Sequence, residues 1–97
     1  MTDDEIVIQI QQAKALVEQA HRADQLSLLP SITPRQKADA EAERNRIYDN
    51  AELVLQPLKA TVSQMAPAVR QMFTLALGEL NDLRRDIDAR PAGKTFR

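Results

Sequence analysis

The sequence has no cysteine, no tryptophan, two glycines and three aromatic residues, and these absences exclude several kinds of site. Without cysteine, the chain can form neither a disulfide framework nor a thiolate metal site. His21 is the only histidine, so there is no pair of histidine ligands and no sign of a Ser-His-Asp arrangement. A glycine-rich phosphate loop is also missing. We therefore predict that the protein is not an enzyme and binds no metal or cofactor.

The net charge is close to zero, and the sequence has no long apolar run. The 97 residues carry a formal net charge of −1, which gives no overall positive field for nucleic acid or for an anionic membrane. No apolar run approaches the roughly 18 residues that span a bilayer. The chain begins with an acidic stretch, whereas a signal peptide begins with a basic one. We expect a soluble, cytoplasmic protein that binds neither a membrane nor a small-molecule substrate.

What the sequence does contain is a regular apolar stripe near its end. Its members recur at intervals of four and three residues and are Val69, Phe73, Ala76, Leu80, Leu83 and Ile87. This spacing predicts an α-helix over 67–90, because a strand would repeat every two residues. The same spacing turns one side of the helix toward a neighbour over several turns, as in a helical bundle or a coiled coil.

A second helix signal lies at the start of the chain. Thr2 and Glu5 have the spacing of a capping box, in which each residue bonds the other's backbone N–H, and this predicts a helix over 3–26. The β-branched run Ile6–Ile10 would score as a short strand by propensity alone. We favour helix, because the cap and the apolar period that follows agree with each other.

The middle of the chain predicts a helix that is interrupted. Thr33, Pro34 and Gln36 supply an N-cap, a proline at the first helical position and a capping partner, so a helix is expected over 34–64. Pro57 lies inside its apolar period, where proline removes an N–H and clashes with a preceding carbonyl. We therefore expect this helix to be kinked or broken near Pro57.

These elements define an all-α fold, namely a three-helix up-down-up bundle with short connections. Residues 1–90 are assigned to a single helical domain. Pro91 and Gly93 end the last helix, so residues 91–97 are assigned to a flexible C-terminal tail. A chain this short buries a limited core, and assembly into an oligomer is expected to supplement it.

Surplus apolar residues predict a partner surface. Some lie outside the helical stripes, which favours a homodimer. Others lie in the connection from Leu26 to Ile32, where they either close over one end of the bundle or contact a partner. The residues assigned to this partner surface are Val7, Ile8, Leu28, Leu29, Leu75 and Leu77.

Charge is distributed unevenly along the chain, with a net of −3 over residues 1–24 and +3 over residues 57–97. Opposite charges on stretches that pack together favour their pairing. Alternatively, the basic end could contact phosphates, with an aromatic ring stacked on a base. The residues of this alternative are Arg84, Arg85, Arg90, Lys94, Phe96 and Arg97.

Two functions follow from these observations. The first is a non-enzymatic interaction protein, such as a small adaptor, a chaperone-like subunit or an inhibitor, which buries helix faces against itself or a protein partner. The alternative is a nucleic-acid-binding accessory protein that uses the basic C-terminal end.

Overall fold

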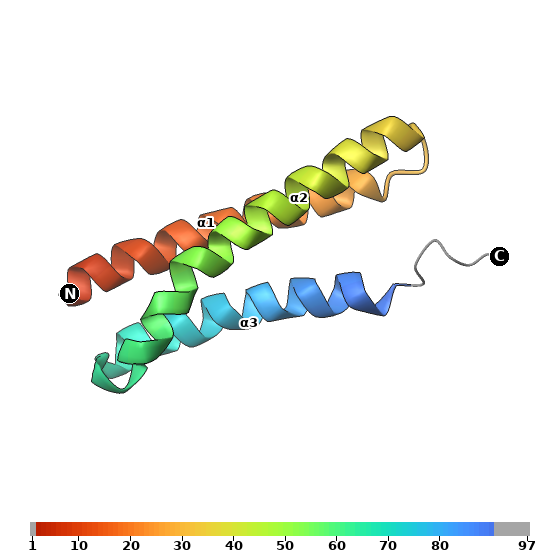
Figure 1. Ribbon diagram of the computed structural model, residues 1–97. Helices are drawn as coiled ribbons and strands as arrows, with labels where there is room; N and C mark the ends of the chain where they lie inside the picture. Colours follow the sequence, from red (N-terminus) through yellow and green to blue (C-terminus); the bar gives the residue numbers. More distant parts are fainter. Residues whose placement is uncertain (1, 91–97) are drawn as a thin grey trace.

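The computed structural model describes residues 2–90, and Figure 1 shows them as a set of helices. No strand occurs among these residues, so the predicted all-α fold is confirmed. The elements are the α-helix α1 (Asp3–Ser27), the α-helix α2 (Pro34–Leu55), the 3-10 helix η1 (Gln56–Gln64) and the α-helix α3 (Pro67–Ala89).

The helices form an elongated body that measures 49 × 20 × 17 Å. In Figure 1, α2 lies along α1, and the connection between them is at one end of the molecule. The 3-10 helix η1 is at the other end and leads into α3, which extends back toward the α1–α2 connection. α1 contacts both of the other α-helices, whereas α2 and α3 touch each other little. The first helix is therefore the element that joins the others.

Both predicted capping boxes are present. The Glu5 N–H donates to Thr2 Oγ1, and the Thr2 N–H donates to Glu5 Oε1, each at 3.3 Å. The corresponding bonds between Thr33 and Gln36 measure 3.0 and 3.1 Å. The run Ile6–Ile10 lies within α1 and is helical, so its interpretation as a strand is wrong. Local caps and the apolar period outweigh the β-branched propensity there.

The core consists of the apolar stripes of all the elements. Five of the six stripe residues predicted in α3 are buried, and Ile87 packs against them while partly exposed. In α2, Tyr48 and Leu55 are buried beside Ile47 and Ala51, whereas Val54 is half-buried. The apolar stripe of α1 is buried in full and consists of Ile6, Ile10, Ala13, Val17 and Ala20.

The predicted break at Pro57 is confirmed, and it takes the form of a change in helix type. The α-helix ends at Leu55, and residues Gln56–Gln64 continue as a 3-10 helix rather than as the α-helix expected to residue 64. Proline has no backbone N–H. It therefore cannot donate the α-helical hydrogen bond to the carbonyl four residues earlier. The tighter 3-10 turn lets the chain continue in helical form beyond it.

Candidate functional site

Three leucines and an isoleucine surround the connection between α1 and α2, and we call this set the leucine tip: Leu26, Leu28, Leu29 and Ile32. The three leucines are 50%, 51% and 49% exposed, whereas Ile32 is half-buried. The interpretation that these leucines close over the end of the bundle is therefore wrong. Asp24 and Ser27, in the last turns of α1, are by contrast buried.

Beside the leucine tip is an open groove of about 540 Å³ between α1 and α2. Leu26, Leu29 and Ile32 contribute apolar side chains to it, and Asp39 and Glu43 contribute carboxylates. Concave surfaces of this size, largely apolar with a few polar groups, are typical of binding sites. The groove can therefore accept apolar side chains of a partner.

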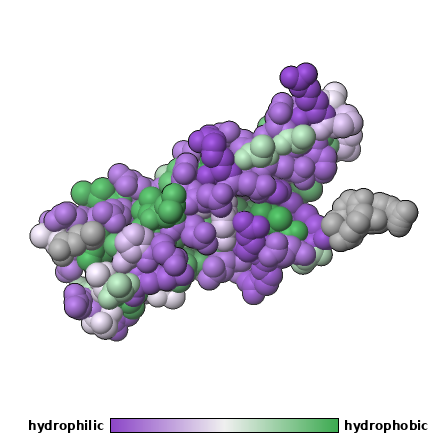
Figure 2. All heavy atoms as spheres, viewed as in Figure 1, coloured by the Kyte–Doolittle hydropathy of each residue, from purple (hydrophilic) through white to green (hydrophobic). Residues whose placement is uncertain are grey.

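The other residues assigned to a partner surface divide into two groups. Ile8 and Leu75 are 54% and 58% exposed, whereas Val7 and Leu77 are half-buried and pack against the core. Leu53 on α2 is the most exposed large apolar residue at 71%, and sequence reasoning did not single it out. Figure 2 shows hydrophobic side chains as separate groups on a mainly hydrophilic face. Of the six predicted residues, Val7 and Leu77 therefore belong partly to the core.

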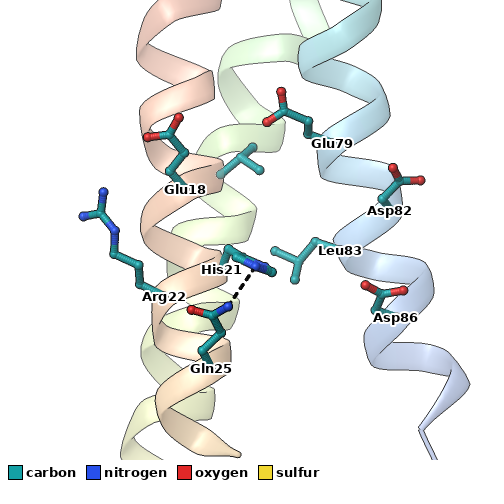
Figure 3. A pocket seen from close by; sticks show the side chains of 9 residues that line it. Glu18, His21, Arg22, Gln25, Glu79, Asp82, Leu83 and Asp86 are labelled. Carbon is teal, nitrogen blue, oxygen red and sulfur yellow. Dashed lines mark hydrogen bonds between the residues drawn. The ribbon is translucent and has the colours of Figure 1, made fainter.

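A second groove, of about 470 Å³, separates α1 from α3. Figure 3 shows Glu18, His21 and Gln25 along α1, with the acidic side chains of α3 on the opposite wall. Gln25 Nε2 and His21 Nε2 are 3.2 Å apart and share a hydrogen bond. No group of three or more His, Cys, Asp or Glu side chains in residues 2–90 could hold a metal ion. The groove is thus an acidic surface, and its carboxylates do not converge on a point.

The arginines assigned to phosphate contact already have partners within the chain. Arg85 forms an ion pair with Asp82. Arg84 lies over the ring of Tyr48, 4.3 Å from its centroid, in a cation–π contact. Arg90 is held by a carboxylate of α1, as described below. Lys94, Phe96 and Arg97 lie outside the described residues. The nucleic-acid alternative remains a prediction, and no observation on the described arginines favours it.

A buried ion-pair cluster joins the three α-helices near the leucine tip. Asp24 on α1 is 2% exposed and accepts from Arg44 Nη1 of α2 at 2.9 Å. Arg90, at the end of α3, donates from Nη1 and Nη2 to the two oxygens of Asp24, at 2.6 Å each. Buried charges of this kind are stable only when they are paired. Asp24 therefore fixes the end of α3 against the α1–α2 pair.

Sequence reasoning missed this cluster, although a signal was present. Asp24 follows Ala20 by four residues and so lies on the apolar stripe of α1, and Arg44 precedes Ile47 by three on the stripe of α2. Arg44 lies among charged residues of both signs, which usually face solvent, but its side chain is only 7% exposed. Opposite charges on two stripes that pack together are the pattern that could have revealed the pair.

The cluster predicts a specific dependence of stability on pH. The hydrogen bonds from Arg90, with a smaller contribution from Arg44, lower the pKa of Asp24 below its ordinary value, although burial acts in the opposite direction. A carboxylate with a lowered pKa in the folded state stabilises the fold above its unfolded pKa, and this stabilisation is lost as pH falls through the folded pKa. We expect the free energy of unfolding to decrease from about pH 5 downward.

Urea unfolding followed by circular dichroism at several pH values measures this decrease. Asp24→Asn lacks the titrating carboxylate, so its free energy of unfolding should decrease less in acid. The difference in free energy of unfolding between wild type and Asp24→Asn should therefore become smaller as the pH falls. The control is Asp39→Asn, which removes an exposed carboxylate that forms no ion pair within residues 2–90. If the free energies of unfolding of wild type and Asp24→Asn differ by the same amount at all pH values, Asp24 is not the source of the pH dependence.

Comparison with protein-family models, with curated protein sequences and with solved structures finds no match to this chain. Within residues 2–90, no helix is both long enough and apolar enough to cross a bilayer. Among the surfaces of the chain, the leucine tip combines three half-exposed leucines with an open groove.

Proposed function

We propose that this chain is a non-enzymatic helical interaction protein of the cytoplasm, folded as an up-down-up bundle, that acts as a small adaptor, a chaperone-like subunit or an inhibitor. It binds by burying the leucine tip against a second copy of itself or against another protein. The observation that supports the proposal is the half-exposed state of three leucines beside an open groove. Each leucine would gain roughly half of the 1.5–3 kcal/mol that complete burial of such a side chain supplies.

The geometry of the tip explains why this surface suits a partner. Leu28 and Leu29 follow the last turn of α1, and Pro30 prevents the helix from continuing past them. Lys37 Nζ donates to the Ser27 carbonyl at 3.1 Å, which ties the start of α2 to the end of α1. The leucines are therefore presented on a supported connection, and little ordering is needed when a partner covers them.

We predict a homodimer in light scattering at roughly 50 µM protein, a concentration at which an obligate dimer is assembled. The double variant Leu28→Gln, Leu29→Gln should be a monomer with unchanged helix content, because both side chains are about half exposed and contribute little to the core. The matched control is Leu53→Gln, which removes an equally apolar and more exposed side chain outside the tip.

If the wild type is a monomer, self-association is contradicted, and the same variants test binding to another protein. A partner captured from the native source by the wild type should also be captured by Leu53→Gln and be lost with the double variant. Identical behaviour of the three chains in both experiments would contradict a role for the leucine tip.

A further inference from the structure

The groove between α1 and α3 has the properties of a docking site for a short basic segment. It is lined by one guanidinium, from Arg22, and by four carboxylates, from Glu18, Glu79, Asp86 and Asp82, the last of which is paired with Arg85. Val17 and Leu83 also line it, and each is only 4% exposed, so the floor of the groove reaches the apolar core. A segment that fits this surface combines positive charge with one apolar side chain.

We propose that residues 91–97 of the same chain dock in this groove. Their sequence is Pro-Ala-Gly-Lys-Thr-Phe-Arg, with two basic residues and no acidic one. Lys94 and Arg97 have the charge opposite to that of the groove walls. Phe96, between them, supplies the apolar side chain that the floor would cover. This inference goes beyond the proposed function and does not rest on it.

The point where the segment begins supports the proposal. The two 2.6 Å hydrogen bonds from Arg90 to Asp24 hold the end of α3 against α1. Gln25, the next residue of α1, and Asp86, one turn before Arg90, both line the groove. The backbone of Arg90 is extended, with φ −69° and ψ 140°, so the helix does not continue past it. The segment therefore starts at one end of the groove.

The length of the segment also matches the groove. Pro91 and Gly93 are residues typical of turns and permit the chain to reverse its direction. The four residues 94–97 then span about 13 Å when extended. The groove wall from Glu79 to Asp86 extends about 10 Å along α3, at a rise of about 1.5 Å per residue. The reversed segment can therefore pass along the whole acidic wall.

The tip groove is a less suitable site for the same segment. Its α1 residues, Ala23 and Leu26, lie roughly 100–160° around the helix from His21 and Gln25, because a helix turns by about 100° per residue. The segment would have to pass around α1 to reach them. The two grooves thus provide matched positions, one expected to contact the segment and one not.

A spin label tests the proposal, and the absence of cysteine makes the labelling specific. In Thr95→Cys carrying a nitroxide, backbone amide NMR signals of residues 18–25 on the groove side and of residues 79–86 should lose intensity. Signals of Asp39 and Glu43 at the tip groove should be retained. Equal loss at both grooves, or no loss at either, would overturn the proposal.

Charge exchange distinguishes docking from accidental proximity. Adding Lys94→Glu and Arg97→Glu to the labelled chain should abolish the intensity loss. Adding Glu18→Lys and Glu79→Lys as well should restore it, because these exposed or half-exposed residues then attract the reversed segment. Failure of the second pair of changes to restore the loss would overturn the role of charge.

A mixing experiment separates docking within one chain from docking between two chains. Isotope-labelled protein without the nitroxide is mixed with unlabelled Thr95→Cys protein that carries it. Docking within the chain predicts that the groove signals in this mixture keep their intensity. Their loss would show that the segment of a second copy occupies the groove and would overturn the assignment to the same chain.

Discussion

Asp24→Ala is expected to lower the free energy of unfolding by about 3–5 kcal/mol, because removing one partner of a buried ion pair leaves the other charge uncompensated. Arg90 is 31% exposed in its side chain and can turn toward solvent. Arg44 cannot do so, since its side chain is 7% exposed, and Asn45 Oδ1, at 3.0 Å, is the one partner left to it within residues 2–90. The total stability of a domain of this size is about 5–15 kcal/mol, so the loss is a large fraction of it.

Chemical denaturation of wild type and Asp24→Ala measures the effect. The control is the double variant Asp24→Leu, Arg44→Met, which replaces the buried charges with apolar groups and should recover most of the lost stability. A decrease of less than about 1 kcal/mol in the free energy of unfolding of Asp24→Ala is typical of surface substitutions. Such a result would contradict the prediction that Asp24 belongs to a buried ion-pair cluster.

Leu80→Ala should destabilise the protein by about 2–5 kcal/mol, because the change removes apolar contact and leaves a cavity in the core. Leu80 is 1% exposed and lies at the centre of the buried stripe of α3. Leu75→Ala is the matched control, since the same change is made in the same helix at a residue that is 58% exposed. Leu75→Ala should change the free energy of unfolding by less than about 0.5 kcal/mol.

Unfolding in urea at neutral pH gives both values under the same conditions. The expected result is a large difference between the two leucine variants. Equal effects of Leu80→Ala and Leu75→Ala would show that the apolar stripe of α3 does not face the core.

The helices were predictable from sequence because their starts, ends and buried sides depend on neighbouring residues. The capping boxes of Thr2 and Thr33 act over three residues, and Pro57 acts on the turn before it. The stripe of α3 depends on a repeat within the helix itself. Signals of this kind act between residues that are close in sequence, so they do not depend on how the helices pack.

The candidate surfaces were predictable only in part. The connection was correctly singled out as unusually apolar, but its sequence left open whether the leucines cover the core or face outward. The choice depends on how the helices pack at that end, and in the structure the three leucines are about half exposed. Similarly, the sequence does not distinguish Leu75 from Leu77, since both are leucines beside the apolar stripe of α3. In the structure Leu77 packs against the core, whereas Leu75 is exposed.

By itself, the sequence determined an all-α chain, the approximate position of each helix, the break at Pro57 and the apolar stripe of α3, since all of these depend on residues within a few positions of one another. Only the tertiary structure decided the pairing of Asp24 with Arg44 and Arg90, across 20 and 66 positions. It also decided which leucines stay exposed and where α1 and α3 leave a groove. These features arise where separate helices meet, and the local pattern of each helix does not specify its neighbour.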